Sequence, residues 1–383
     1  MAFERDRLTA GEVDRIYSRS IRPDLLDDVP RSSAPTAVLI GGQPGAGKSF
    51  TLAQVRAQLA STVGAAATLA GDEVREYHPY WRSHARLDAQ AAQRTQADAG
   101  AWYARLTNDG IAKGANLLFE TSMRQPEALL KLTERLRGAG YEVTAVVLAV
   151  EKDMSRQATL TRYDVARTVG DVPRFVPGPY HDGAYDRLRD TVARLESDRA
   201  VDRIQIITRD GRQLYTNLVE QGHWAKQPKA LASLDDFRER ALPARELADS
   251  ALRWQTLVQR LASDPSVPRE VAAQVVAWRN EATQRAERDP DAQRLLQWGR
   301  EAEAFKTMHR HQFAREFPQH AKLAERLQEA INYAEGNFGH AVDRERFIKQ
   351  ARDRIAERIA EGRSAAPPAP EKATSRGREG RTR

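Results

Sequence analysis

The amino-acid sequence predicts an α/β fold in which a mostly parallel sheet has helices on both faces, followed by an all-α helical bundle. Two observations predict it. Up to about residue 220, short apolar segments alternate with longer segments of helical periodicity, which is typical of a parallel sheet with crossover helices. Beyond residue 234, apolar residues recur only at three- and four-residue spacing, which favours helices.

The sheet is expected to begin at residues 36–40, an apolar run that leads into a Gly-rich turn and a helix over residues 48–59. Residues 142–150, EVTAVVLAV, give the strongest strand signal in the chain. Asp210-Gly211 favours a hairpin turn between strands at 203–208 and 212–216. The other strands are expected at residues 67–70 and 116–119, and the other helices at 87–113, at 154–169, at 185–195 and ending near 137.

The second half is expected to form a bundle of four or five helices. Pro265, Pro268, Pro290 and Pro318 fall where such helices should begin or end. Trp254, Trp278 and Trp298 are interpreted as bundle core rather than as a platform for stacked bases. The chain thus divides into a domain over residues 1–225, a helical domain over 235–362 and a disordered basic tail over 363–383, rich in Pro, Ala, Gly and Arg.

The composition of the chain limits which classes of protein it can belong to. The chain has 383 residues, of which 41% are hydrophobic and 30% charged, as in a globular protein of two or three domains. It has no apolar run long enough for a membrane helix, no signal peptide and no cysteine, so the cytoplasm is the expected compartment. The net charge of +7 suits polyanionic ligands such as nucleotides and does not by itself indicate nucleic-acid binding.

Residues 42–49, Gly-Gln-Pro-Gly-Ala-Gly-Lys-Ser, fit the phosphate-loop pattern G-x-x-x-x-G-K-[ST] between a strand and a helix. Glycines let backbone N–H groups converge on phosphate oxygens, and the positive end of the helix favours an anion. We expect Lys48 to reach the outer phosphates and Ser49 to ligate Mg²⁺. The expected residues for ATP and Mg²⁺ are therefore Gly42, Gln43, Pro44, Gly45, Ala46, Gly47, Lys48 and Ser49.

The rest of the sequence favours a kinase of the P-loop NTPase class over other nucleotide-binding proteins. The chain has no Asn-Lys-x-Asp motif for guanine, and no apolar run ends in the Asp-Glu pair of a motor ATPase. Asp72 and Glu120 follow the second and third strands, so both are expected at the carboxyl edge of the sheet. Asp72 there could accept the proton of an attacking hydroxyl, and Glu120 could hold a substrate hydroxyl or Mg²⁺. A helix cap or a turn is the alternative for either carboxylate, and position alone does not decide.

Two arginines near the Pro-rich loop after the fourth strand, Arg162 and Arg174, are candidates for stabilising a transferring phosphoryl group. Considered individually, either arginine is better explained as a solvated surface residue. His309, His311 and His320 are interpreted as structural rather than metal-binding, because residues two apart on a helix do not face the same way.

In combination, these motifs resemble those of the zeta toxin family, the kinase half of bacterial epsilon/zeta toxin–antitoxin systems. The resemblance covers about residues 10–220. The segments that carry it, in order, are residues 41–49, Gly71-Asp72 with His78-Pro79, residues 116–122, residues 140–143, Thr161-Arg162-Tyr163, residues 173–177 and residues 206–211.

The resemblance implies a phosphotransferase with an alcohol acceptor, which uses ATP and Mg²⁺ to phosphorylate the sugar 3′-hydroxyl of UDP-N-acetylglucosamine or a related metabolite. Such an enzyme is toxic unless neutralised. The resemblance also implies that Asp72 is the catalytic base, with Lys48 and Ser49 on the phosphates and Mg²⁺. Arg162 and Arg174 would clamp the phosphates from a lid. The sugar site would be formed by Glu120, Thr121 and Ser122.

The sequence departs from the family pattern at two places near the expected sugar site. The usual Glu-Gly-Thr reads Glu120-Thr121-Ser122 here, and residues 102–105 lack the carboxylate that some members carry before the third strand. Two alternatives therefore stay open. One is a P-loop kinase of another small hydroxyl compound, and the other is an ATP-gated binding protein that acts through its helical domain.

The helical half lies outside the resemblance. It is interpreted first as an accessory bundle with a solubilising tail. A second hypothesis is that it covers the nucleotide site in cis, in place of or beside a separate antitoxin protein, so that deleting it would raise activity. The expected partners are thus a small-molecule substrate and an antitoxin, with no membrane, and nucleic acid is disfavoured. Three alternatives stay open for the helical half: docking of a partner protein, nucleic-acid binding by the tail, and a secretion signal in the tail. Action in the protein's own cell or after delivery to another also stays open.

Overall fold

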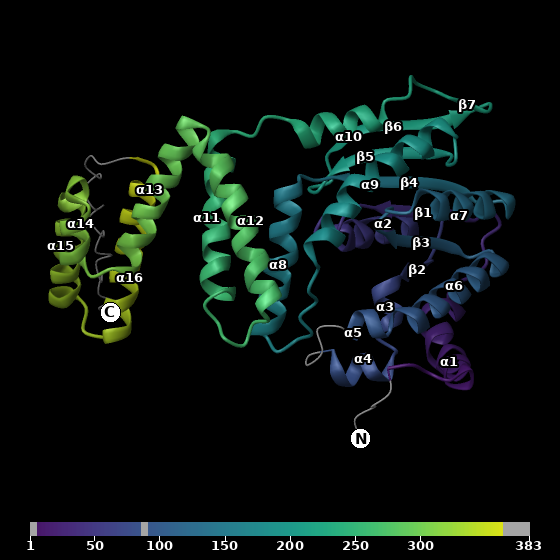
Figure 1. Cartoon of the computed structure of the whole chain (residues 1–383), viewed down its shortest axis with the longest axis horizontal. Coiled ribbons are helices and arrows are strands. Elements are labelled where there is room, and N and C mark those ends of the chain that lie inside the picture. The colour runs from purple at the N-terminus through teal and green to yellow at the C-terminus, as the bar shows by residue number, and fades with distance from the viewer. Residues whose placement is uncertain (1–5, 86–90, 363–383) are drawn as a thin grey trace, which may run out of the picture. The chain divides into compact units, whose positions relative to one another are not determined.

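The computed structural model describes residues 6–85 and 91–362 (Figure 1). These residues form two compact units. The first unit contains the described residues up to Leu242 together with Arg253–Ala282. The second contains Pro243–Leu252 and the described residues from Thr283 onward. The predicted disordered tail, residues 363–383, lies outside the described residues.

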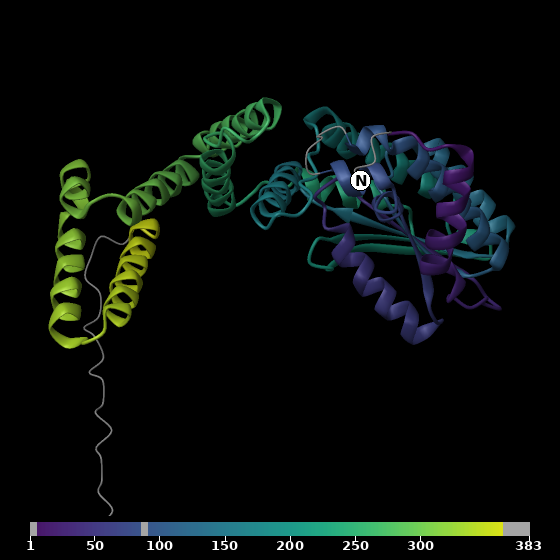
Figure 2. The same cartoon turned by 90° about the horizontal axis from the view of Figure 1, so that it is seen from below.

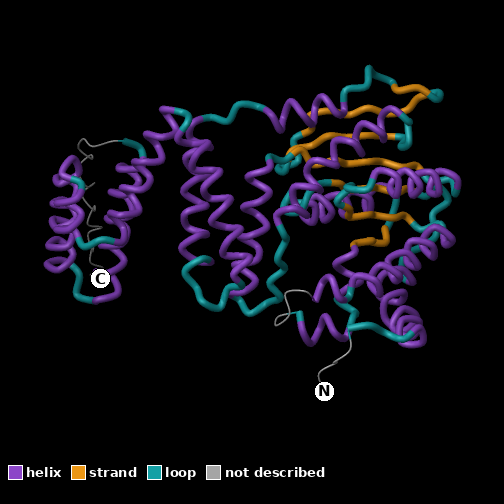
Figure 3. Tube along the Cα trace, in the orientation of Figure 1, coloured by secondary structure: helices purple, strands orange, loops and turns teal. Residues whose placement is uncertain are grey.

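The first unit is built around a seven-stranded sheet, drawn in orange in Figure 3. The strands are β1 (Thr36–Gly41), β2 (Ala66–Ala70), β3 (Asn116–Thr121), β4 (Glu142–Ala149), β5 (Arg203–Thr208), β6 (Gln213–Glu220) and β7 (His223–Trp224). Their order across the sheet is β2-β3-β1-β4-β5-β6-β7. Strands β1 to β5 pair in parallel, and β6 and β7 are antiparallel. The predicted mostly parallel sheet is therefore confirmed.

Helices lie on both sides of this sheet, as the view in Figure 2 shows. The helices of this part of the chain are α1 (Ala10–Ile16), α2 (Lys48–Thr62), α3 (Gly71–Arg75), α4 (Pro79–His84), α5 (Ala91–Arg94), α6 (Gln96–Lys113), α7 (Pro126–Gly138), α8 (Lys152–Thr168), α9 (Gly178–Ser197) and α10 (Ala230–Glu239), with π-helical turns at Tyr17–Ile21 and Pro23–Asp27. In place of the single long helix expected over residues 87–113, the described residues from Ala91 onward form two helices, α5 and α6. Residues 86–90 lie outside the described part.

Alternate residues of the central strands are buried on opposite faces of the sheet. Val38 and Ile40 of β1 pack in one cluster with α2, whereas Ala37 and Leu39 pack in the other with α6, α7 and α9. Because both faces are covered, the strands read as continuous apolar runs rather than as alternating ones. Their register then places the carboxyl ends together, since Ala70 of β2 pairs with Glu120 of β3 and Gly41 of β1 pairs with Thr121.

Two long helices follow the sheet and run through both units: α11 (Ala244–Leu261) and α12 (Arg269–Glu287). Residues 253–282 of this pair, the hairpin segment, pack against α8 in the first unit (Figure 1). Trp254 and Trp278 are buried there, in one cluster with Leu160 and Tyr163 of α8. They are core residues as expected, but their cluster includes α8 and does not lie in a separate helical bundle.

The second unit contains only helices among its described residues. They are α13 (Pro290–Thr307), α14 (Arg310–Glu316), a 3-10 turn (Pro318–His320), α15 (Ala321–Asn337) and α16 (Ala341–Ala360). Phe305, Phe313 and Leu327 belong to their common core. Pro290 begins α13 and Pro318 begins the 3-10 turn, as the proline positions predict. Within the described ranges, no helix is long and apolar enough to span a membrane.

Candidate active site

The loop between β1 and α2, residues 42–47, has the geometry of a phosphate-binding loop. It turns on two left-handed glycines, Gly45 with φ 78° and Gly47 with φ 97°. Gly45 also lies against α8, where a Cβ atom would come within 2.1 Å of the Ser155 carbonyl oxygen. Gly47 is the N-cap of α2, so the free amides of that helix open onto the loop. The loop can therefore surround an anion at the carboxyl edge of β1.

Lys48, the first residue of α2, directs its amine back across the loop. Its Nζ donates to the carbonyl oxygens of Gly42 at 3.0 Å and Gln43 at 3.2 Å. Desolvation lowers the pKa of Lys48, and Glu120 and Asp72 act in the opposite direction. A cation held at the mouth of a phosphate loop is the donor that outer phosphate oxygens require.

Asp72 and Glu120 lie at the same edge as the phosphate loop, as predicted from their places after β2 and β3. Asp72 is in the first turn of α3, and its side chain is 55% exposed. Glu120 accepts a hydrogen bond of 3.3 Å from the Ser49 hydroxyl. Hydroxyl and carboxylate oxygens are the ligands that Mg²⁺ takes from proteins, with phosphates and water completing its shell. Ser49 and Glu120 therefore fit a magnesium ion.

Two arginines, one from the same helix and one from a distant segment, contact Asp72. Arg174, in the segment between α8 and α9, contacts Asp72 Oδ2 at 3.1 Å and Glu76 Oε1 at 2.7 Å. Arg75 of α3 also bonds to Asp72. Burial raises the pKa of Asp72, but Arg174 and Arg75, with a further contribution from Arg162, outweigh it and leave the pKa below its usual value. Asp72 is thus an ionised carboxylate surrounded by positive charge.

Arg162 of α8 completes this cluster of charges. Desolvation lowers the pKa of Arg162. The negative charge of Asp72 acts against this shift, and the positive charge of Arg174 adds to it. It also contributes to the lowered pKa of Lys48, so its charge acts on the phosphate loop. The structure therefore brings together Lys48, Asp72, Glu120, Arg162 and Arg174, which come from separate parts of the chain.

Thr121 and Ser122 lie where β3 gives way to the next loop. Thr121 is the last residue of the strand, and its hydroxyl accepts from the Met123 amide at 3.1 Å. Ser122 follows in the loop and is half-buried. The segment of α6 without a carboxylate, residues 102–105, contacts α1 near the N-terminus. Trp102 Nε1 donates to the Val13 carbonyl, and Arg105 pairs with Asp14.

Sequence reasoning missed the residues that hold the phosphate loop in place. The fully buried Gln43 donates from Nε2 to the Val150 carbonyl at 3.0 Å and to the Ser155 hydroxyl at 3.1 Å. Its Oε1 accepts from Arg238 of α10 at 2.9 Å. Burial lowers the pKa of Arg238 to about 10. The motif contains Gln43, but no signal in the sequence identifies Arg238, which lies far along the chain.

Ser155 also belongs to a buried chain of three groups with the connectivity of a hydrolase triad. Ser155 Oγ lies 2.9 Å from His181 Nε2, and His181 Nδ1 lies 2.9 Å from Asp182 Oδ1. Both Ser155 and His181 are fully buried, and the carbonyl oxygens of Glu151 and Lys152 also lie within 3.0 Å of the Ser155 hydroxyl. A nucleophile must reach its substrate, so this chain is structural: it connects α8 and α9 to Gln43.

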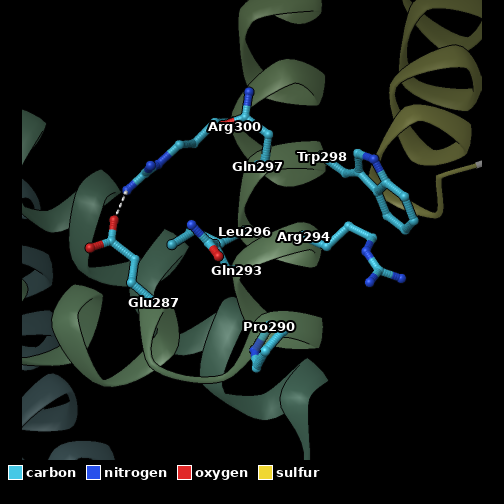
Figure 4. Close-up of a pocket in the computed structure, with 8 residues that line it drawn as sticks. All are labelled: Glu287, Pro290, Gln293, Arg294, Leu296, Gln297, Trp298 and Arg300. Carbon is cyan, nitrogen blue, oxygen red and sulfur yellow. Dashed lines mark ion pairs between the residues drawn. The ribbon is translucent and has the colours of Figure 1, made fainter.

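The other candidates of the sequence do not form a site. His320 pairs with the buried Glu301 at 2.7 Å, whereas His309 caps α14. Within residues 6–85 and 91–362, no cluster of three or more His, Asp or Glu side chains could hold a metal ion. A shallow hollow in the second unit is lined by a set of mixed residues that includes none of the predicted site residues (Figure 4). Its lining is Glu287, Pro290, Gln293, Arg294, Leu296, Gln297, Trp298 and Arg300.

The sequence model described as zeta toxin matches residues 23–220, just over half of the chain. The chain belongs to the zeta toxin family. The resemblance inferred from its motifs is thereby confirmed, and the kinase-like character of the family agrees with a phosphotransferase site at the sheet edge.

Individual relatives cover between about half and two thirds of the chain. The toxin PezT of Streptococcus pneumoniae is 29% identical over 209 residues, which are 54% of this chain and 81% of that protein. A zeta toxin of Enterococcus hirae is 26% identical over 48% of this chain and 64% of its own length. A solved structure from the PezAT chromosomal toxin-antitoxin system has a TM-score of 0.55 at 24% identity, covering 66% of this chain and 99% of that one.

Membership of the zeta toxin family assigns residues 23–220 and ends before α11. The candidate site, from the phosphate loop to Arg174, lies inside the matched region. The hairpin segment that packs on α8 lies outside it.

Proposed function

We propose that this zeta toxin family protein is an ATP-dependent kinase that phosphorylates a hydroxyl group of a nucleotide sugar, UDP-N-acetylglucosamine or a close relative. One observation carries the proposal: Lys48, Asp72 and Arg174, with Glu120 and Arg162, converge at one edge of the sheet. A phosphate loop alone binds nucleotide, but a carboxylate among arginines beside it supplies what a transfer to a hydroxyl needs.

In the proposed reaction, the acceptor hydroxyl attacks the γ-phosphorus of ATP and the bond to the β,γ-bridging oxygen breaks, releasing ADP. Asp72 accepts the hydroxyl proton. Lys48 and Arg162 stabilise the charge on the transferring group, and Arg174 exchanges a carboxylate partner for the phosphoryl oxygens. Magnesium, held by Ser49 and assisted by Glu120, would neutralise charge on the β- and γ-phosphates.

The test is transfer of labelled phosphate from ATP to UDP-N-acetylglucosamine by the full chain and its Asp72→Asn variant. Loss of a general base typically lowers the rate roughly 10²- to 10⁴-fold, whereas ATP affinity should change little. Asp190→Asn is the matched control, because Asp190 is an exposed carboxylate of α9 remote from these contacts. Equal transfer by wild type and Asp72→Asn would reject the base assignment.

A specific observation favours testing other hydroxyl acceptors in the same assay. The acidic residues that α6 does carry have other partners: Asp98 pairs with His78 and accepts from the Leu8 amide, and Asp109 accepts from Tyr17. A sugar held by a carboxylate of α6 would have to displace one of them. In one outcome, UDP-N-acetylglucosamine stays unphosphorylated while another hydroxyl compound raises ATP turnover. The proposed kinase class would then stand, and that compound would replace the nucleotide sugar as the proposed acceptor.

The names of the relatives, toxin PezT and toxin zeta, together with a structure from a toxin-antitoxin system, support a further part of the proposal. We infer that the kinase activity is toxic to a cell unless a protein antitoxin neutralises it. Induced expression of wild type should then arrest growth, and Asp72→Asn should not.

A further inference from the structure

The hairpin segment, residues 253–282, contacts both ends of the chain segment that carries Arg174. The segment that carries Arg174, residues 169–177, connects α8 to α9 and is here called the arginine loop. At its beginning, Arg167 of α8 donates to Asp264 Oδ2 at 2.9 Å and to the Ser266 hydroxyl at 3.0 Å. Asp264 and Ser266 lie in the turn between α11 and α12.

At the other end of the arginine loop, a single side chain of α12 bonds to the backbone twice. Gln274 Oε1 accepts from the Gly178 amide at 2.6 Å, and Gln274 Nε2 donates to the Val176 carbonyl at 3.0 Å. Backbone groups of a loop have no ladder partner, so these two bonds replace what secondary structure would supply. They fix the backbone within four residues of Arg174.

Between these two ends, the residue next to Arg174 is packed into the hairpin segment. Phe175 lies against the cluster that contains Trp254, Val271 and Trp278, and its ring meets Tyr163 edge to face at 6.2 Å. Phe175 is thus held against the hairpin segment, while its neighbour Arg174 contacts Asp72 and Glu76.

Polar contacts make the attachment of the hairpin segment to α8 specific. Arg156 stacks over Trp278 at 4.9 Å, bonds to Asp182 of α9 and reaches Glu281 of α12 at 2.6 Å. Trp254 Nε1 donates to Asp153 at 2.7 Å, and Arg260 pairs with the buried Asp164 at 2.9 Å. An apolar interface alone would permit sliding, whereas these bonds define one register.

We propose that the hairpin segment is an intrachain clamp whose positioning residue Gln274 fixes the arginine loop so that Arg174 reaches the transferring phosphoryl group. This inference rests on the proposed kinase function. It assigns a role in the reaction to residues beyond 23–220, the range that the zeta toxin sequence model matches. It also predicts that losing the clamp lowers transfer, the opposite of what cis-inhibition by the helical half would give.

The first test is hydrogen exchange of the arginine loop in the full chain, which needs no acceptor. Gln274→Ala should speed exchange at Gly178 and its neighbours, because the amide loses its acceptor. Gln274→Glu, which keeps the acceptor oxygen and loses the donor, should fall between. Gln284→Ala, an exposed glutamine of the same helix, should match wild type. Unchanged exchange in Gln274→Ala would overturn the clamp.

The second test is the dependence of Gln274 on Arg174 in the transfer assay. Gln274→Ala should lower kcat by roughly 10- to 100-fold, the scale of a misplaced catalytic group, with KM for ATP nearly constant. Combined with Arg174→Ala it should cost almost nothing more, because the loop then positions no arginine. If the loss of kcat in the double variant equals the product of the two single losses, Gln274 acts independently of Arg174, and the inference is overturned.

The two tests also separate this inference from the proposed function. A wild type that transfers phosphate to no hydroxyl acceptor would reject the kinase, whatever the exchange of the arginine loop. A transferring wild type with normal exchange and normal kcat in Gln274→Ala would reject the clamp alone.

Discussion

At the scale of single residues, the buried side chains that support the phosphate loop have strict requirements for hydrogen bonding and protonation. His181 is fully buried between the Ser155 hydroxyl and Asp182, so it cannot be solvated when it gains a proton. Burial lowers the pKa of His181 from its usual value of 6.5, although Asp182 opposes this shift. The structure therefore favours the neutral ring, which keeps α8, α9 and the phosphate loop connected.

This predicts a pH dependence of stability with a definite sign. Below pH 6.5 the unfolded chain protonates this histidine and the folded one resists, so the free energy of unfolding falls as pH decreases. A fully neutral histidine contributes a slope of up to about 1.4 kcal/mol per pH unit. Melting temperatures between pH 7.5 and pH 5.5 measure it. His181→Gln should flatten the slope, whereas the exposed His340→Gln should not; equal slopes in all three would contradict the prediction.

Residue by residue, the sequence was informative where chemistry requires a fixed pattern. The phosphate loop follows from its glycines, Lys48 and Ser49, because few other spacings surround a phosphate. Asp72 and Glu120 could be placed at the sheet edge from their positions after strands. Gln43 and Arg238 could not be paired, because 195 residues separate them and only the folded chain brings them together.

At the scale of elements, α8 connects the candidate active site to the hairpin segment. One face carries Arg162, and another packs Leu160 and Tyr163 against Trp254 and Trp278. The cluster also contains Leu257, Val271 and Val275, so α8 is covered by apolar side chains from two helices. Such a face cannot be left in water without a large loss of stability.

Trp254→Ala should therefore destabilise the first unit by about 3 to 5 kcal/mol, because it opens a cavity in this cluster and removes a bond to Asp153. Urea unfolding, followed by the intrinsic fluorescence of the other tryptophans, measures the loss as a lower midpoint. Val165→Ala, on an exposed position of α8, should stay within about 0.5 kcal/mol of wild type. A midpoint for Trp254→Ala equal to that of the control would show that α11 does not stabilise α8.

Helical periodicity explains why the elements were predicted better than their partners. The spacing of Trp254, Leu257 and Leu261 indicates an apolar helix face, but no local pattern says which surface covers it. The same holds for Val271, Val275 and Trp278. The interpretation as a separate bundle followed from chain order, whereas the structure groups these residues with α8.

At the scale of the whole molecule, the boundary between the units does not follow a single cut in the chain. The first unit includes residues on both sides of Pro243–Leu252. A fragment ending at residue 282 keeps the hairpin segment, and a fragment ending at residue 242 loses it. The shorter fragment exposes the apolar face of α8, which soluble monomers rarely tolerate as a large patch.

The fragment ending at residue 282 should consequently melt close to the full chain, and the one ending at 242 should melt lower and bind a hydrophobic dye. Calorimetry and dye fluorescence measure both. Transfer activity adds a second comparison: the clamp predicts less activity in the shorter fragment, and cis-inhibition by the helical half predicts more. Equal melting temperatures of the two fragments would show that the hairpin segment does not stabilise the first unit.

The discontinuous first unit has a consequence for synthesis. The phosphate loop, Asp72 and Arg174 leave the ribosome before the residues that hold the arginine loop. At typical elongation rates the roughly 100 residues from Arg174 to Ala282 take about 5 to 20 s to add. If the proposed function holds, a nascent chain would bind nucleotide early and become a competent kinase only after the hairpin segment has been made, so that a product truncated before this segment would harm its producer least.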